Sequence, residues 1–218
     1  HAGPEIGVAS TKAFLGQLLV LYILILKISE KRGNLDKKSF DAKIKNLKKI
    51  PDAIANTLKT EEQIEIVAKD FLKAKGTMYL GRGLSFPIAL EGALKLKELS
   101  YLHAEGYPAG EMKHGPLALI EDGLPVVVLA PNDKYFEKTI SNMQEVIARG
   151  GKILLITDKS NEVINENLRF KLEIPFIEEN LSPFLMTVPL QLLAYHVALL
   201  KKCDIDKPRN LAKSVTVE

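Results

Sequence analysis

The chain has 218 residues, enough for one full domain with an additional segment, and its 46% hydrophobic and 26% charged residues are ordinary for a soluble globular protein. Its 30 Lys and Arg residues exceed its 27 Asp and Glu residues by only three and form no cluster interleaved with aromatics, which argues against a nucleic-acid-binding protein. Cys203 is the only cysteine, which excludes an internal disulfide framework and a multi-cysteine metal site and favours a reducing, cytoplasmic location.

The first predicted element is a helix over the apolar run Ala13–Leu26. This run is shorter than the roughly 18 to 20 apolar residues that span a membrane, and Gln17 and Lys27 interrupt or close it, so we expect no membrane span. A helix that is apolar nearly all round is typical of a segment buried on nearly all sides. We therefore expect it to pack against a partner, most simply a symmetry-related copy in a homodimer.

Helices and strands alternate along the rest of the chain, after a candidate break at Gly33-Asn34. Apolar residues at three- and four-residue spacings predict helices, and continuous apolar runs such as 125–130 predict strands. Strands that lack alternation and are separated by helices predict a parallel sheet covered on both faces, an αβα sandwich. The predicted helices are 37–60, 61–73, 87–103, 134–149 and 183–202, and the predicted strands are 77–81, 125–130, 152–157 and 170–174.

One loop follows a predicted strand at the edge of the sheet where ligands of such folds bind. The segment Gly81-Arg-Gly-Leu-Ser85 leads into a helix whose N-terminus favours anions. It is too short for a nucleotide-binding fingerprint, and a tight turn that needs glycine explains it equally well. Both interpretations remain open.

The next helix carries two carboxylates around an ammonium group. Glu91, Lys95 and Glu98 lie at i, i+4 and i+7, within one sector of the helical face, and Lys97 lies on the far side. Such a group could move a proton between neighbouring carbon atoms. Lys95 would lower the carboxylate pKa values, whereas burial would raise them. The spacing by itself favours a solvated surface ladder.

His114, in the segment Lys113–Pro116, is one of four histidines. A neutral imidazole could open a sugar ring by proton transfer at the ring oxygen, and an ordinary loop histidine is the alternative. His103 and His196 lie on predicted apolar helices and are expected to be core or interface residues. Because no two histidines have helical metal-ligand spacing, we predict no metal site.

The C-terminal segment Asn210–Glu218 alternates Leu211, Val215 and Val217 with small polar residues around Lys213. This pattern suits a tail that docks into a groove and brings one amine there, and a desolvated lysine can form an imine with a carbonyl. A surface tail with a solvated lysine is the alternative, and the tail by itself favours it.

Several segments, in one order from the first residue to the last, resemble the sugar-isomerase half of the glutamine–fructose-6-phosphate aminotransferase family, also called glucosamine-6-phosphate synthases. The resemblance implies a flavodoxin-like sugar-isomerase (SIS) sheet preceded by N-terminal helices. The segments are Glu5–Phe14, Gly81–Gly83 with Pro87–Glu98, Tyr107–Leu119, Val188–His196, and Lys207–Glu218.

The resemblance also implies what the chain lacks. The family has a glutaminase domain with an N-terminal cysteine nucleophile, followed by two SIS subdomains. Residues 1–35 would be the end of the first subdomain, 36–67 connecting helices, 68–209 the second SIS domain and 210–218 the active-site tail. The Ser/Thr-rich loop that holds the sugar phosphate would lie upstream, so we expect this fragment to have little activity alone.

The site residues that the resemblance implies serve conversion of fructose 6-phosphate, with ammonia from glutamine, into glucosamine 6-phosphate. Lys213 would form an imine with the open-chain sugar, Glu98 would move a proton between C1 and C2, and Lys95 and Glu91 would tune the site. His114 would open the ring and would come from the second subunit of a dimer. Val8, Ser10 and Ala212 would touch the sugar. No metal, nucleotide or flavin cofactor is implied.

Two other functions remain open. A stand-alone SIS-family sugar-phosphate deaminase or deglycase would run related chemistry without a glutaminase domain. A non-catalytic sugar-phosphate-sensing SIS module would need neither an imine lysine nor a proton shuttle, so the set of Glu91, Lys95, Glu98, His114 and Lys213 argues against it.

Overall fold

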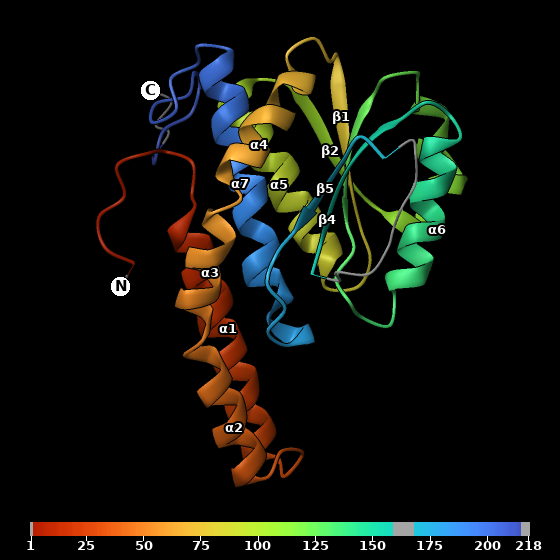
Figure 1. Cartoon of the computed structure of the whole chain (residues 1–218). Helices are drawn as coiled ribbons and strands as arrows, with labels where there is room; N and C mark the ends of the chain where they lie inside the picture. The colour runs from red at the N-terminus through yellow and green to blue at the C-terminus, as the bar shows by residue number, and fades with distance from the viewer. Residues whose placement is uncertain (1, 159–167, 215–218) are drawn as a thin grey trace.

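Five parallel strands form a central sheet in the order β2-β1-β3-β4-β5 (Figure 1). This is the flavodoxin-like order, and it confirms the predicted fold class. The computed structural model describes residues 2–158 and 168–214. The strands are β1 (Gly76–Gly81), β2 (His103–Pro108), β3 (Pro125–Leu129), β4 (Lys152–Thr157) and β5 (Phe170–Glu173).

Both faces of the sheet are buried because helices cover both. Along β1, Tyr79 packs into the cluster on one face, while Met78 and Leu80 pack into the cluster on the other. The first face carries α4 (Glu61–Ala68), α5 (Ser85–Ser100) and α7 (Ser182–Leu200), and the second carries α6 (Phe136–Ile147) (Figure 1). Full coverage explains why the strands read as continuous apolar runs.

The N-terminal helices form a hairpin that extends away from the sandwich (Figure 1). It consists of α1 (Lys12–Lys31) and α2 (Lys37–Leu47), joined through a turn in which Gly33 has a φ of 74°. The helix predicted over 37–60 is in fact two, because the chain breaks before α3 (Ile50–Leu58), which has proline in its first turn. A small core of Leu47, Ile50, Leu181 and Phe184 joins the hairpin to the sandwich.

The prediction that the first helix is buried on nearly all sides is wrong for the single chain. Leu26 is its one buried residue, whereas Val20, Leu21 and Ile25 are 65%, 55% and 59% exposed. The helix is also longer than the apolar run from which it was predicted. Among the described residues, it and Glu179–Leu200 are the two helices long and apolar enough to cross a membrane. The core helix of a soluble protein can be equally long and apolar, and α7 is such a helix, because most of it is buried. Helix α1 is instead mostly exposed in the single chain.

The structure contains a strand that the sequence analysis missed. The helix predicted to reach His103 ends at Ser100, where Tyr101 adopts a left-handed conformation with a φ of 59°, and edge strand β2 follows. His103 is therefore an exposed residue of that strand and not part of the core. His196 is buried on α7, with Nε2 3.2 Å from Glu61 Oε1, as expected for a core histidine.

Candidate active site

Glu91, Lys95 and Glu98 form a shielded charge cluster on α5. Lys95 is only 3% exposed, and its Nζ lies 3.6 Å from Glu91 Oε1 and donates a hydrogen bond to Glu98 Oε2. Solvated helical ladders keep their ammonium groups in water, so the surface interpretation of this spacing is wrong. A buried ammonium group between two carboxylates is more typical of a functional site.

The carboxyl group of Glu91 is the most unusual member of this cluster. Burial raises the pKa of Glu91, the positive charge of Lys95 opposes that rise, and the negative charge of Glu98 adds to it. Glu91 Oε1 is buried without a hydrogen-bond partner, because 3.6 Å is an ion-pair distance. The cluster therefore contains a carboxyl group that holds its proton more strongly than a solvated glutamate does.

Lys213 lies in the tail, on the exposed surface, and not among the charges of α5. Its side chain is 46% exposed, and its Nζ donates a hydrogen bond of 2.7 Å to Glu5 Oε2. Among residues 2–158 and 168–214, no hydrogen bond or ion pair joins Lys213 to Glu91, Lys95 or Glu98. The predicted docking in a groove is wrong for Leu211 and Ala212, which are exposed; Val215 and Val217 lie outside the described residues.

The early segment with Val8 and Ser10 lies beside the chain that leads into the tail. The Val8 N–H donates to the Asp206 carbonyl at 2.9 Å, although the two residues lie near opposite ends of the chain. The structure therefore brings together two parts of the predicted site, the segment of Val8 and Ser10 and the tail with Lys213. The Glu5 carboxylate, which was not predicted, links them through its hydrogen bond from Lys213.

His114 ends a short 3-10 segment, Ala109–His114, that follows β2. Its side chain is 74% exposed, and Nε2 lies 4.0 Å from Glu111 Oε2. Within the described part of the chain, this imidazole contacts neither the α5 cluster nor Lys213. An exposed position is what a histidine that serves a second subunit requires.

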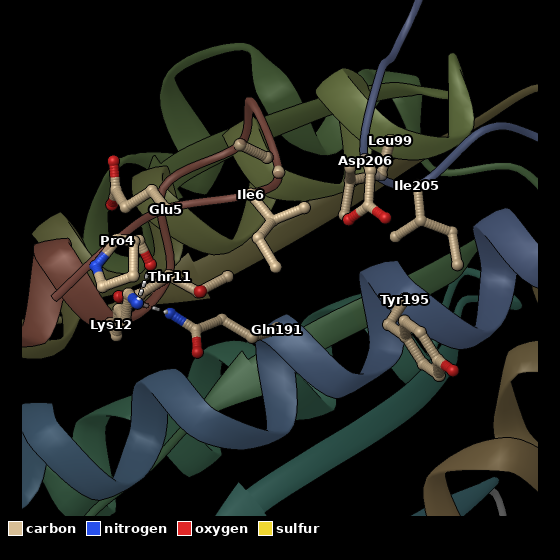
Figure 2. A pocket seen from close by; sticks show the side chains of 12 residues that line it. Pro4, Glu5, Ile6, Thr11, Lys12, Leu99, Gln191, Tyr195, Ile205 and Asp206 are labelled. Carbon is tan, nitrogen blue, oxygen red and sulfur yellow. Dashed lines mark hydrogen bonds between the residues drawn. The ribbon is translucent and has the colours of Figure 1, made fainter. Parts of the chain in front are cut away.

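A cavity of about 320 Å³ lies between the N-terminal segment and α7 (Figure 2). None of the predicted site residues, all of which the structure describes, lines it. Its lining includes neighbours of four of them, namely Glu5 beside Lys213, Leu99 next to Glu98, and Ala9 between Val8 and Ser10. The polar lining residues include Glu5, Gln191, Tyr195 and Asp206, none of which was predicted as a site residue, and Lys12, which was expected to be solvated at the start of the first helix.

Glu5 is a missed residue for which the sequence held a signal. It opens the Glu5–Phe14 segment that carries the resemblance, yet nothing local indicates that it meets a lysine 208 positions later.

The loop after β1 is built for packing. The Arg82 guanidinium donates two hydrogen bonds to Asn142 Oδ1, at 3.2 and 3.0 Å, and a Cβ on Gly110 would lie 2.7 Å from its Nη2. A Cβ on Gly81 would lie 2.4 Å from the Ser85 carbonyl oxygen. These contacts favour the tight-turn interpretation of Gly81–Ser85. In the described ranges no group of three or more His, Cys, Asp or Glu side chains could hold a metal ion.

Comparison with known proteins assigns the family. The SIS domain family matches residues 70–201. Glutamine–fructose-6-phosphate aminotransferases [isomerizing] of Aquifex aeolicus and Bradyrhizobium diazoefficiens are 53% and 55% identical over 218 residues, which is all of this chain and 36% of each relative. The chain thus spans about a third of the length of these relatives.

Solved structures agree. The C-terminal domain of glucosamine-fructose-6-phosphate aminotransferase from Francisella tularensis has a TM-score of 0.91 and 47% identity, covering 94% of this chain and 58% of that one. Glucosamine-6-phosphate deaminase from Thermotoga maritima has a TM-score of 0.69 and 25% identity, covering 99% and 60%. The chain therefore belongs to the SIS domain family, and its sequence matches the C-terminal part of glutamine–fructose-6-phosphate aminotransferases.

Proposed function

We propose that this chain is part of the isomerase half of a glutamine–fructose-6-phosphate aminotransferase, which converts fructose 6-phosphate and ammonia from glutamine into glucosamine 6-phosphate. The observation that carries the proposal is the identity of about half over all 218 residues with enzymes of that name. The buried cluster of Glu91, Lys95 and Glu98 supports it, because a protein that only binds a sugar phosphate has no need of a shielded proton-transfer group.

The proposed chemistry needs an amine, an imidazole and a positioned carboxylate. His114 of a second copy would open the sugar ring by proton transfer at the ring oxygen. The amine of Lys213 would add to the C2 carbonyl, and loss of water would give the imine. Ammonia would then replace the lysine at C2 and release Lys213 as a free amine. Glu98 would take a proton from C1 and return it to C2, with the charge of Lys95 beside it and Glu91 completing the cluster. Val8, Ser10 and Ala212 would contact the sugar.

The proposed active form contains more than this chain. We propose that residues 1–35 complete an upstream SIS subdomain, that 36–67 connect it to the second SIS domain at 68–209, and that 210–218 close the site. The exposed apolar face of α1 supports this, because it offers a large surface for a further domain or a second copy. We also expect a homodimer in the cytoplasm, and little activity from the 218 residues alone.

The two alternatives are less well supported. The deaminase of Thermotoga maritima covers the chain almost fully but at 25% identity, against 47% for the aminotransferase domain. In a sugar-phosphate-sensing module, the buried Lys95 and the two carboxylates beside it would have no catalytic role.

A chimera tests the proposal directly. The matching C-terminal part of the Aquifex aeolicus relative is replaced by residues 1–218, and glucosamine 6-phosphate formation is measured from fructose 6-phosphate and glutamine. We expect activity in the chimera and its loss in Lys213→Arg, because a guanidinium does not deprotonate to form an imine at working pH. Hydrolysis of glutamine, measured separately, should survive in both and shows that the glutaminase domain is folded; circular dichroism shows that the variant as a whole is folded like the parent chimera.

Borohydride trapping identifies the lysine. With fructose 6-phosphate present, the C-terminal peptide of the chimera should gain the mass of the reduced sugar-phosphate adduct, and that of the Lys213→Arg variant should not. An adduct on Lys95 with Lys213 unmodified would show that the wrong lysine was assigned. A chimera that hydrolyses glutamine but makes no amino sugar would refute the proposed function.

A further inference from the structure

The chain that leads to Lys213 is fixed to the rest of the molecule at defined points. Asp204 Oδ1 accepts hydrogen bonds from the N–H groups of Asp206 and Lys207, at 3.0 and 2.9 Å, and turns the chain after α7. Pro208 is buried, although Arg209 to Ser214 are exposed. An exposed terminal segment normally frays unless such contacts hold it.

Tyr101 holds the start of the tail. It caps the C-terminus of α5, three residues after Glu98, in a left-handed conformation. Its hydroxyl accepts a hydrogen bond of 2.9 Å from the Arg209 N–H, and the Arg209 guanidinium lies 4.2 Å from the centre of its ring. These two contacts link the tail to the end of the helix that carries the charge cluster.

Glu5 holds the far end of the same segment, through its 2.7 Å hydrogen bond from Lys213. The Glu5 segment is itself fixed, because Val8 donates to Asp206 and the Lys12 ammonium donates to the Pro4 carbonyl. The hydrogen bond from Lys213 lowers the pKa of Glu5; burial opposes this to a smaller extent, and the charges of Lys213 and Lys12 lower the pKa slightly further. Glu5 is thus a carboxylate at neutral pH and faces two ammonium groups.

We propose that Glu5 and Tyr101 are positioning residues that together hold the amine of Lys213 in one place. Lys213 lies four positions after Arg209, so the segment that joins these two anchored residues can extend by no more than about 14 Å. An exposed ion pair adds little to stability, so the main effect of the Glu5 contact is on where the amine lies and how freely it reacts. We call the contacts of Tyr101 with Arg209 and of Glu5 with Lys213 the clamp. Its role in catalysis rests on the proposed function, whereas the contacts themselves are present in this chain alone.

The clamp can be tested on the 218-residue chain without any sugar. The rate at which Lys213 is acetylated by a limiting amine reagent is measured by peptide mass spectrometry between pH 7 and 10. In Glu5→Gln we expect this rate to rise about two- to fivefold, because the charge-assisted hydrogen bond that holds the amine is replaced by a weaker one. Glu5→Asp keeps the charge and should restore part of the protection. In Tyr101→Phe the Arg209 amide should exchange its hydrogen faster than in the wild type.

Matched controls separate the clamp from general effects on stability. Asp41 pairs with Lys37 at 3.0 Å in another exposed ion pair, so Asp41→Asn should change the reactivity of Lys37 and leave Lys213 unchanged. Tyr135→Phe, which removes a hydroxyl at the start of α6, should leave the exchange of Arg209 unchanged. Equal acetylation of Lys213 in wild type and Glu5→Gln would overturn the role of Glu5, and unchanged Arg209 exchange in Tyr101→Phe would overturn that of Tyr101.

The chimera links the clamp to the reaction. Glu5→Gln should lower the turnover number for amino-sugar formation with little change in the KM for fructose 6-phosphate, and Glu5→Asp should recover part of it. Glutamine hydrolysis should not change. An intact clamp in an inactive chimera would refute the proposed function alone, whereas an active chimera with full turnover in Glu5→Gln would refute the positioning role alone.

Discussion

Gly92 permits the close contact of α5 with α7, and replacing it by alanine should destabilise the protein. A Cβ at this position would lie 2.5 Å from Leu190 Cδ1, 3.1 Å from Leu190 Cβ and 3.0 Å from a ring carbon of Tyr79. Neither neighbour can move into free space, because both are fully buried. Overpacking of this kind costs about 1 to 3 kcal/mol. Alanine also stabilises a helix by about 1 kcal/mol relative to glycine, so we expect a net loss of about 1 kcal/mol.

Gly16, in the interior of α1, is the matched control. A Cβ there would meet no atom within 4 Å, so Gly16→Ala should stabilise the protein by up to about 1 kcal/mol. Both substitutions replace a helical glycine by alanine, so the helix term cancels when the two are compared. The remaining difference of about 1 to 3 kcal/mol is the cost of packing at Gly92.

Urea unfolding followed by circular dichroism measures both variants at the same protein concentration. The combination of Gly92→Ala with Leu190→Ala should cost less than the sum of the two single changes, because the second change removes Leu190 Cδ1, the nearest of the atoms that the new Cβ would strike. If Gly92→Ala and Gly16→Ala shift the midpoint in the same direction by similar amounts, the packing argument is wrong.

Three further outcomes are expected. Lys95→Met should lower the free energy of unfolding by about 2 to 4 kcal/mol at pH 7, because Glu91 and the partly exposed Glu98 lose their cation. The loss should be smaller near pH 4, where Glu91, whose pKa is raised by burial, carries its proton; an equal loss at both pH values would contradict this. Burial raises the pKa of Glu91 in the folded state above its value in the unfolded chain, so ionisation of Glu91 destabilises the folded state as the pH rises through this range. The stability of Glu91→Gln relative to the wild type should therefore increase between pH 4 and 8 in urea titrations, and a difference that stays constant with pH would argue against this. Light scattering should find the chain as a dimer or larger at micromolar concentration and the double variant Val20→Glu, Ile25→Glu as a smaller species; a monomeric wild type would mean that α1 needs no partner copy.

Local pattern was enough to predict most of the fold. The runs 125–130 and 152–157 are apolar without alternation, and this happens only when both faces of a strand are covered, so a parallel sheet between helix layers followed from them. Strand β2 was missed because it lies at the edge of the sheet and has no apolar run, while the helical spacing of α5 continued past its true end at Ser100. The left-handed turn at Tyr101 that ends this helix has no glycine to indicate it.

The candidate site, like the fold, was predicted in part from the sequence, and the tertiary structure decided the rest. Spacing alone placed Glu91, Lys95 and Glu98 on one face of a helix, because the helical period is a property of the backbone. Whether that face meets water depends on what the fold packs around it, and only the tertiary structure showed that Lys95 is buried. The contact of Glu5 with Lys213 joins residues 208 positions apart. No local pattern encodes a contact at that separation, because it forms only after the sheet and its helices have brought the two ends of the chain together.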